Sequence, residues 1–265
     1  MGPAAAAGFT SVVNIQRARG RALQWRRMSL TYLVLDIETI PDRDLFTPPE
    51  PAPGVDRGFP PLYACKPVVI GVLWLDEDLT CKRIGTIGED KDEAGMLIDF
   101  ADFMSQRRPH LVTWNGRSFD LPVLALRALR HGISFPWYYR DRDYRYRYST
   151  DGHLDLCDFL SDHGAAKMTS LDGAARTIGL SGKDGVDGSQ VEGLFHAGQI
   201  EALRHYCLSD VAQTAFLFLR YRLLVGQIDR DTYKHAATGL LAALAADPRT
   251  ERVTVTADRA RLLLE

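Results

Sequence analysis

Two carboxylates lie two residues apart at the end of an apolar run in the segment TYLVLDIETIPD, residues 31–42. They are Asp36 and Glu38. If the segment is a strand, side chains two residues apart point to the same face of the sheet. Adjacent carboxylates repel each other unless a cation lies between them, and a hard divalent ion such as Mg²⁺ takes carboxylate oxygens as ligands. A D-x-E pair is also common at strand ends, so this segment alone leaves the metal site an open hypothesis.

Two later segments place further acids at the ends or faces of predicted helices. In LVTWNGRSFDLPVL, residues 111–124, Asn115 ends a predicted strand and Asp120 begins a predicted helix, where the helix dipole favours a carboxylate. In HYCLSDVAQT, residues 205–214, Tyr206 and Asp210 are four apart and share one helix face. Each motif also has a purely structural explanation. Asp120 could simply begin its helix, and Tyr206 and Asp210 could be a solvent-exposed pair.

Taken together, the three motifs resemble those of the DEDD superfamily of 3′→5′ exonucleases, in its tyrosine subclass. The order is D-x-E on a first strand, N-x-x-x-F-D at a strand-to-helix junction and Y-x-x-x-D on a late helix. The closer resemblance is to the predicted exonucleases related to the proofreading domain of family B DNA polymerases. HLDLCDFL and SLDGAARTIGL, at residues 153–160 and 170–180, also look like later motifs of that family. The resemblance covers roughly residues 31–225.

The resemblance implies an active site with two divalent cations, Mg²⁺ or Mn²⁺. Asp36, Glu38 and Asp210 would hold the ion that binds the attacking water, and Asp36 would share the second ion with Asp120. Four crowded carboxylates are tolerable only with about two cations roughly 4 Å apart. Tyr206 would orient the water, because a phenol with a pKa near 10 is a poor base at neutral pH.

The same resemblance assigns substrate-facing positions to Thr39, Asn115 and Phe119. Thr39 would lie near the terminal nucleotide. Phe119 could stack on a terminal base, an interaction that tolerates any sequence, or it could be the first core residue of its helix. Both interpretations of Phe119 stay open.

A separate segment, PWYYRDRDYRYRYS at residues 136–149, interleaves arginine with aromatic residues. Arg145, Tyr146 and Arg147 are its candidate substrate contacts, since arginine binds phosphate and aromatic rings stack on bases. The period-two alternation equally fits an edge strand with tyrosine on one face and arginine on the other. The two interpretations agree if the strand borders the substrate cleft.

The elements that would position these residues predict a mixed α/β fold. Hydrophobic periodicity predicts strands at 31–38, 67–75, 80–87 and 110–114, and helices at 90–106, 119–131, 200–224 and 230–246. A further strand and two short helices near 155–163 and 170–179 are expected, with a proline-rich loop at 41–64 and a glycine-rich loop at 182–189. The resemblance specifies this as an RNase H-like mixed five-stranded sheet flanked by helices.

Composition narrows the class of protein. A hydrophobic fraction of 46% with 25% charged residues is typical of a folded globular chain, and no apolar run is long enough to span a bilayer. Four cysteines without C-x-x-C spacing indicate free thiols rather than a zinc motif.

A cytoplasmic protein that does not associate with membranes is therefore expected, and its oligomeric state is left open. The net charge of −2 excludes no partner.

The predicted organisation is an exonuclease domain with two extensions. Residues 1–28 are expected to be a disordered or mis-set N-terminal extension, although their arginine-rich, acid-free composition also resembles a transit peptide. Residues 29–247 form the RNase H-like exonuclease domain and 248–265 a C-terminal tail.

The leading prediction is a metal-dependent 3′→5′ exonuclease that hydrolyses single-stranded DNA or RNA from a free 3′ end and releases nucleoside 5′-monophosphates. A structure-selective endonuclease on the same fold and a non-catalytic nucleic-acid-binding module are the alternatives. No residue of the sequence decides between DNA and RNA.

Overall fold

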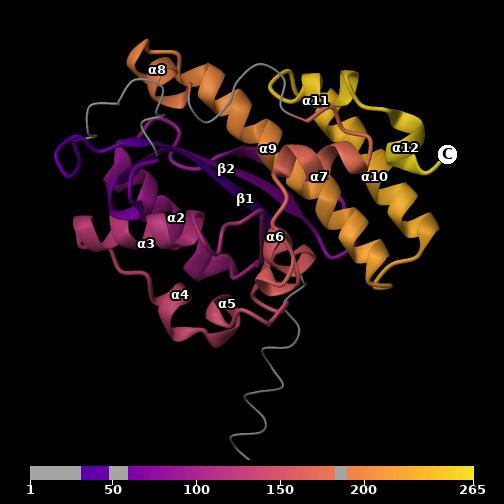
Figure 1. Ribbon diagram of the computed structural model, residues 1–265, viewed down its shortest axis with the longest axis horizontal. Helices are drawn as coiled ribbons and strands as arrows, with labels where there is room; N and C mark the ends of the chain where they lie inside the picture. The colour runs from indigo at the N-terminus through magenta and orange to yellow at the C-terminus, as the bar shows by residue number, and fades with distance from the viewer. Residues whose placement is uncertain (1–30, 48–58, 183–189) are drawn as a thin grey trace, which may run out of the picture. The chain divides into compact units, whose positions relative to one another are not determined.

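The computed structural model describes residues 31–47, 59–182 and 190–265, and these form a five-stranded sheet with helices on both faces (Figure 1). The strand order is β3-β2-β1-β4-β5. β1 and β2 pair antiparallel, as do β2 and β3, whereas β1–β4 and β4–β5 are parallel. The predicted mixed α/β sheet is confirmed. The strands are β1 (Tyr32–Pro41), β2 (Cys65–Leu75), β3 (Cys81–Thr86), β4 (His110–Thr113) and β5 (His153–Asp155).

The helices predicted at 90–106, 119–131, 200–224 and 230–246 and near 155–163 and 170–179 are present, with boundaries that differ by a few residues, and the described residues contain five further short helices that were not predicted. The helices are α2 (Glu93–Arg107), α3 (Asp120–His131), α4 (Pro136–Arg140), α5 (Arg142–Arg145), α6 (Leu156–Leu160), α7 (Leu171–Thr177), α8 (Val191–His196), α9 (Ile200–Leu224), α10 (Arg230–Ala245), α11 (Glu251–Val255) and α12 (Arg259–Leu263), with short 3₁₀ turns η2 (Leu62–Ala64) and η3 (Asp162–Gly164).

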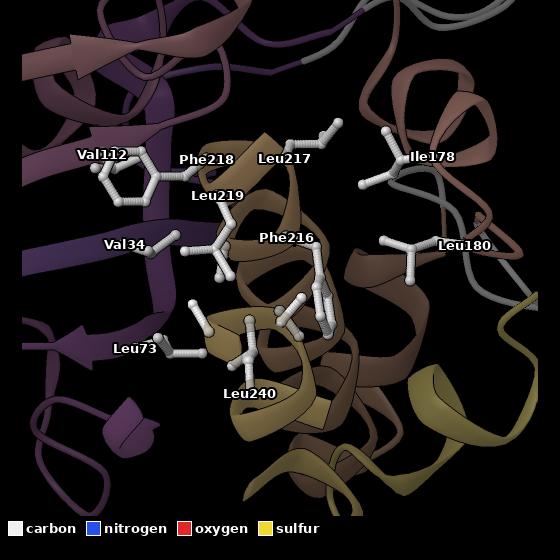
Figure 2. Close-up of a cluster of buried hydrophobic side chains, with 14 of the residues drawn as sticks. Val34, Leu73, Val112, Ile178, Leu180, Phe216, Leu217, Phe218, Leu219 and Leu240 are labelled. Carbon is white, nitrogen blue, oxygen red and sulfur yellow. The ribbon is translucent and has the colours of Figure 1, made fainter. Parts of the chain in front are cut away.

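Alternation along β1 sends its side chains into two different cores. Leu33, Leu35 and Ile37 pack with α2, α3 and α4 on one face of the sheet. Val34, one step out of phase, packs on the other face with α7, α9 and α10. Figure 2 shows side chains of β1, β2 and β4 turned toward α9 and α10 in this second core; they include Val34, Leu73 and Val112.

The end of β1 is tied to α2 and α3 by a buried arginine. Arg127 of α3 contacts the Asp42 carboxylate at 2.7 Å and donates to Oε2 of Glu93 at 2.8 Å. Burial raises the pKa of both acids, but the hydrogen bonds and charge of Arg127 outweigh it, so the net pKa of each is lowered. The chain just after Glu38 is therefore fixed to the helix that carries Asp120.

The predicted loops and extensions fall partly outside the described residues. Residues 48–58 of the proline-rich loop and 183–189 of the glycine-rich loop are not described, nor are residues 1–30. Residues 248–265, expected as a tail, contain α11 and α12, whose Val253, Leu262 and Leu263 are buried in the same core as α10. The division of the chain into a domain and two extensions stays a prediction.

Within the described part of the chain, no helix combines the length and the apolar character that a membrane crossing requires.

Candidate active site

β1 carries Asp36 and Glu38 on the face that α9 covers. Asp36 pairs with Gly71 of β2, and the β1–β2 register shifts between Glu38 and Thr39. The residue opposite Thr39 is Pro67, which has no N–H to donate to the ladder. The irregularity comes after Glu38, so the period-two alternation that places both acids on one face holds through both of them.

α9 approaches this face of β1 closely enough for side-chain contact. The thiol of Cys207 lies 3.4 Å from the Asp36 carbonyl oxygen and 3.5 Å from its Oδ2 atom. A Cβ atom at Gly71 would lie only 2.6 Å from Sγ of Cys207. Glycine at this position therefore permits the approach that brings Tyr206 and Asp210, the neighbours of Cys207 on α9, to the acids of β1.

Asp120 reaches the same place from the start of α3. It is 3% exposed, and its carboxylate accepts a hydrogen bond from the backbone N–H of Ile37, between Asp36 and Glu38 on β1. The loop before α3 is held by Asp155 at the end of β5, whose carboxylate accepts from the backbone N–H groups of Asn115 at 2.9 Å and Arg117 at 2.8 Å. Asp155 thus holds the loop that leads into Asp120, and Asp120 in turn holds α3 against β1.

The four acids perturb one another's protonation. Burial raises the pKa of Asp36 well above its usual value. The negative charges of Asp120, Asp210 and Glu38 raise it further, in that order. Burial also raises the pKa of Asp120 to about 7, despite the hydrogen bond from Ile37. Carboxylates from three distant segments therefore share one electrostatic environment that favours a positive ion.

Tyr206 sits within this acidic environment as a neutral phenol. Burial raises the pKa of its hydroxyl, and the charges of Asp210, Glu38 and Asp36 raise it further. A hydrogen bond with Asp210 acts in the same direction. The protonated hydroxyl is thus a hydrogen-bond donor to a carboxylate, and its oxygen retains lone pairs that can accept from water.

The donor set fits a divalent cation. Asp36, Glu38 and Cys207 each offer one ligand atom, and these atoms lie within 4.8 Å of one another. The carboxylate oxygens of Asp36 and Glu38 suit Mg²⁺ and Mn²⁺, whereas the thiol of Cys207, whose pKa burial raises well above its usual value, does not. Helical spacing predicts Cys207 only as an inward-facing residue of the long helix. Its place against Asp36 depends on the packing of α9 on β1, which no local pattern reports.

The predicted substrate residues of the first two motifs lie beside these acids in the chain and take different local roles. Thr39 follows Glu38 at the register shift. Asn115 adopts a left-handed backbone with φ of 63°, a conformation that asparagine tolerates. Phe119 is half-buried against the α2–α3 core and packs edge-on to Phe59, with ring centroids 5.4 Å apart. Its core interpretation therefore holds in part, and base stacking stays a prediction.

The arginine–tyrosine segment is not an edge strand, so that prediction is wrong. Residues 136–149 instead contain α4 and α5. Pro136 occupies the first turn of α4, where it is favoured, and Trp137 and Tyr144 are buried. Burial of Trp137 in α4 and of Tyr144 in α5 stabilises these two short helices. The alternation of arginine and tyrosine in the second half of the segment therefore does not produce a strand.

The three residues of this segment that were predicted to contact substrate interact with neighbouring side chains instead. Arg145 lies over the ring of Tyr139 at 5.0 Å, and Tyr146 lies under Arg142 at 4.9 Å. Arg147 donates from Nε to the Asp158 carboxylate at 2.8 Å. These side-chain contacts lie within residues 138–163, and none of them reaches the acids of β1, α3 or α9.

Asp155 is the positioning residue that sequence reasoning only partly identifies. As the residue before α6, it caps that helix: its carboxylate accepts from the backbone N–H of Asp158 in the first turn, at 3.3 Å. The additional hydrogen bonds to the loop before α3 join residues about 40 positions apart. The local signal in the sequence is an aspartate at the end of a short strand, directly before a helix.

Comparison with known proteins decides the family. A model of the family described as predicted 3′-5′ exonucleases related to the exonuclease domain of PolB matches residues 57–257, about three quarters of the chain. The chain belongs to this family. The resemblance proposed from Asp36, Glu38, Asp120, Tyr206 and Asp210 is thereby confirmed at the level of the family. The individual residue roles stay predictions.

One curated relative of this PolB-related exonuclease family member is a polymerase of much greater length. The chain is 26% identical over 140 residues to the catalytic subunit of DNA polymerase epsilon from Schizosaccharomyces pombe, in a match that covers 51% of this chain and 6% of the polymerase. It therefore spans only a small part of that curated relative.

One solved structure supports the fold. The family B DNA polymerase of the archaeon Pyrobaculum calidifontis matches 83% of this chain and 29% of its own, with a TM-score of 0.52 and 20% identity. Exonuclease I of E. coli, in complex with a dA16 oligonucleotide, matches 76% of this chain and 46% of its own at 14% identity, with a TM-score of 0.34. The predicted RNase H-like fold of this family member is confirmed, and the second likeness is too distant to add to it.

Proposed function

We propose that this chain is a metal-dependent 3′→5′ exonuclease that removes nucleoside 5′-monophosphates from single-stranded DNA or RNA with a free 3′ end. One observation carries the proposal. Carboxylates from β1, α3 and α9 lie close enough for the charges of Asp120, Asp210 and Glu38 to raise the pKa of Asp36. Such a cluster is electrostatically costly without bound cations, and it is the feature that a phosphodiester hydrolase of this family requires.

Two Mg²⁺ or Mn²⁺ ions would supply charge stabilisation at the phosphate and a lower pKa for the attacking water. Asp36, Glu38 and Asp210 are the proposed ligands at the water side, and Asp36 with Asp120 at the other. Tyr206 donates its hydroxyl proton toward Asp210, and its oxygen accepts from the attacking water. The role of this phenol is orientation, because its raised pKa leaves it protonated at neutral pH.

Two regions are the proposed substrate contacts. Thr39, Asn115 and Phe119 lie in the segments that carry the acids, which supports a contact with the terminal nucleotide. Arg145, Tyr146 and Arg147 would meet the strand further from the cut. Arg147 is bidentate with Asp158, so its contribution would require exchange of that carboxylate for a phosphate.

The test is cleavage of 5′-labelled DNA and RNA 20-mers in Mg²⁺ or Mn²⁺. We expect a ladder that shortens stepwise from the 3′ end and is abolished by chelation. Asp36→Ala and Asp210→Ala should each abolish it, since each removes a proposed metal ligand. Asp102→Asn, an exposed acid on α2, is the matched control and should cleave like the wild type.

Other results of this experiment would contradict the assignment or indicate another function. Cleavage by Asp210→Ala at the wild-type rate would contradict the assignment of the site. Internal fragments without a ladder would indicate an endonuclease. Binding of the oligonucleotide without metal-dependent cleavage would indicate a binding module.

A further inference from the structure

A pocket of about 520 Å³ lies between β2, β3 and the C-terminal half of α2. Its floor includes Leu33 of β1, and alternation along β1 places Leu33 on the other face of the sheet from Asp36 and Glu38. The volume is within the range of about 300–1,000 Å³ that is typical of ligand sites. The sheet therefore separates this pocket, called the sheet-face pocket below, from the proposed active site.

The sheet-face pocket is apolar, and its space is open because a strand residue lacks a side chain. Gly85 of β3 lies opposite Val72 in the β2–β3 register, and a Cβ atom at Gly85 would meet no atom within 4 Å. Trp74 and Phe103, which also line the pocket, are only partly buried, and their rings pack edge-on with centroids 5.4 Å apart. An apolar side chain of another molecule could enter here without displacing any described residue.

The rim of the sheet-face pocket is positively charged. Three cations and no acid are among the described residues that line it. Lys82 is paired with Asp76, with Nζ 2.7 Å from the carboxylate. Arg83 of β3 and Arg107 in the last turn of α2 are exposed, and neither makes an ion pair within 4 Å with an acid that the structure describes. Each of these two guanidinium groups can bind a carboxylate with two parallel hydrogen bonds.

This charge distribution selects among the possible occupants. A second copy bound through the same surface would bring the arginines of the two rims together, because a two-fold interface pairs a patch with itself. Residues 1–30 of this chain contain five arginines and no acid, so they carry the wrong charge. Single-stranded nucleic acid needs a charged track with open ring faces, whereas Lys82 is already neutralised and the two rings meet edge to face. An apolar side chain flanked by carboxylates fits both the pocket and its rim.

We propose that the sheet-face pocket binds an acidic peptide segment of a partner protein. One apolar side chain of the peptide enters the space over Gly85, beside Trp74 and Phe103, and neighbouring carboxylates bind Arg83 and Arg107. The inference goes beyond the proposed exonuclease activity and does not depend on it. Because the pocket and the acid cluster lie on opposite faces of the sheet, the partner can be held without blocking the proposed active site.

The test is fluorescence anisotropy of a fluorescein-labelled octapeptide, DDELFEDD, titrated with the full chain. We expect saturable binding that weakens as NaCl screens the charges. Gly85→Leu fills the pocket and should weaken binding by more than about tenfold, the effect of losing an apolar contact of this size. Arg83→Ala and Arg107→Ala should each weaken it by about three- to fivefold, as for loss of an exposed ion pair. The peptides DDEAAEDD, without the apolar anchor, and NNQLFQNN, without charge, should both bind more weakly than DDELFEDD.

Two substitutions on the other face of the sheet are the matched controls. Gly239 on α10 is also a glycine whose Cβ atom would meet no atom within 4 Å, and Arg259 on α12 is an exposed arginine. Gly239→Leu and Arg259→Ala should bind the peptide like the wild type. Thermal unfolding checks that Gly85→Leu is folded, and the exposed arginines decide the matter if it is not.

The inference would be overturned if the peptide does not bind saturably, or if none of the three substitutions at the pocket weakens its binding. It would also be overturned by binding of fluorescein-labelled octathymidylate in EDTA that these substitutions weaken equally, which would assign the pocket to nucleic acid. Dimerisation that Gly85→Leu abolishes in sedimentation would assign it to a second copy of the chain.

The peptide titration is independent of cleavage. Gly85→Leu should degrade oligonucleotides at the wild-type rate, because Gly85 lies on the other face of the sheet from the acids. A chain that cleaves but does not bind the peptide loses the peptide site alone. A chain that binds the peptide but never cleaves supports the peptide site and refutes the proposed function.

Discussion

The environment of a single side chain, Tyr206, decides what that side chain can do. A phenol free in solution is already a weak base at neutral pH, and burial beside Asp210, Glu38 and Asp36 raises its pKa further. The hydroxyl is therefore fixed in its protonated form. Under the proposed mechanism its contribution is geometric, since it holds the attacking water in line rather than removing a proton from it.

The first prediction concerns Tyr206→Phe, which removes only this hydroxyl. We expect kcat to fall by about 10- to 100-fold, because a misplaced reactant costs up to about two orders of magnitude. The affinity for Mn²⁺ should remain near that of the wild type, since the carboxylates are untouched. Single-turnover cleavage and Mn²⁺ titration measure the two quantities. An equal loss of metal affinity would contradict a positioning role.

Gly71 is a second residue whose importance only its neighbours reveal. It lies opposite Asp36 on β2, and a methyl group there would meet Sγ of Cys207 at 2.6 Å and Cγ2 of Val211 at 3.2 Å. The absence of a side chain at Gly71 is what lets α9 rest on the strands that carry the acids.

The second prediction is that Gly71→Ala destabilises the protein by about 1–3 kcal/mol, the usual cost of overpacking a close contact. The double variant Gly71→Ala with Cys207→Ala should recover part of this loss, because the closest clash involves the Cys207 thiol. Urea unfolding of the four proteins in the cycle gives the coupling energy. Strictly additive losses would show that the thiol is not the atom that resists the methyl group.

At the scale of elements, the end of β5 organises the entrance to α3. Asp155 binds two backbone N–H groups of the loop before α3 and one in the first turn of α6. The loop leads directly into Asp120, whose carboxylate bonds to β1 at Ile37. A carboxylate at the end of β5 thus helps to fix the position of Asp120 at the start of α3.

The third prediction is that Asp155→Ala lowers both stability and cleavage. Leaving N–H groups without their charged acceptor costs about 1.5–3 kcal/mol, and Asp120 should lose its fixed position. Asp155→Asn retains one acceptor oxygen and should lie between the wild type and Asp155→Ala. Thermal unfolding and the cleavage rate are the measurements.

The control for Asp155 is another capping aspartate that lies elsewhere in the fold. Asp229 begins α10 and accepts from the backbone N–H of Thr232 at 2.8 Å. Asp229→Ala should lower the unfolding temperature while the cleavage rate per folded molecule stays near wild type. A similar loss of rate in both variants would mean that Asp155 acts through general stability alone.

Across the whole molecule, the sheet separates two cores, and a buried histidine lies at its β5 edge. His153 is fully buried, and one of its ring nitrogens lies 2.8 Å from Oγ1 of Thr113. Burial lowers the pKa of His153 well below its usual value, and the charge of Arg117 lowers it further. The folded chain therefore keeps this imidazole neutral at pH values where the unfolded chain protonates it.

The fourth prediction follows from that difference. As pH falls below about 6.5, the unfolded state binds a proton that the folded state does not, so stability contributed by His153 is present above that pH and lost below it. Urea unfolding at pH 7.5 and 5.5 should show a loss in the wild type that exceeds the loss in His153→Gln by roughly 1 kcal/mol. Equal losses in the two proteins would show that His153 is protonated in the folded state.

The local patterns of the sequence were sufficient to predict most of the strands and long helices and to recognise the motifs. Period-two alternation placed Asp36 and Glu38 on one face of β1, and helical spacing placed Tyr206 and Asp210 on one face of α9; both depend only on backbone geometry within a few residues. The same patterns, with their order along the chain, indicated the family. They failed at residues 136–149, where buried Trp137 and Tyr144 outweighed a strand-like alternation.

The tertiary structure alone decided which distant groups meet. Cys207 contacts Asp36 across 171 positions, and Asp155 holds the Asn115 loop across 40. The C-terminal segment lines a cavity beside Tyr206. Such contacts depend on how whole helices pack on the sheet, because burial of the apolar faces, rather than any local motif, selects the partner surface. The acids could therefore be named from their spacing, while their shared environment and the residues that support it required the fold.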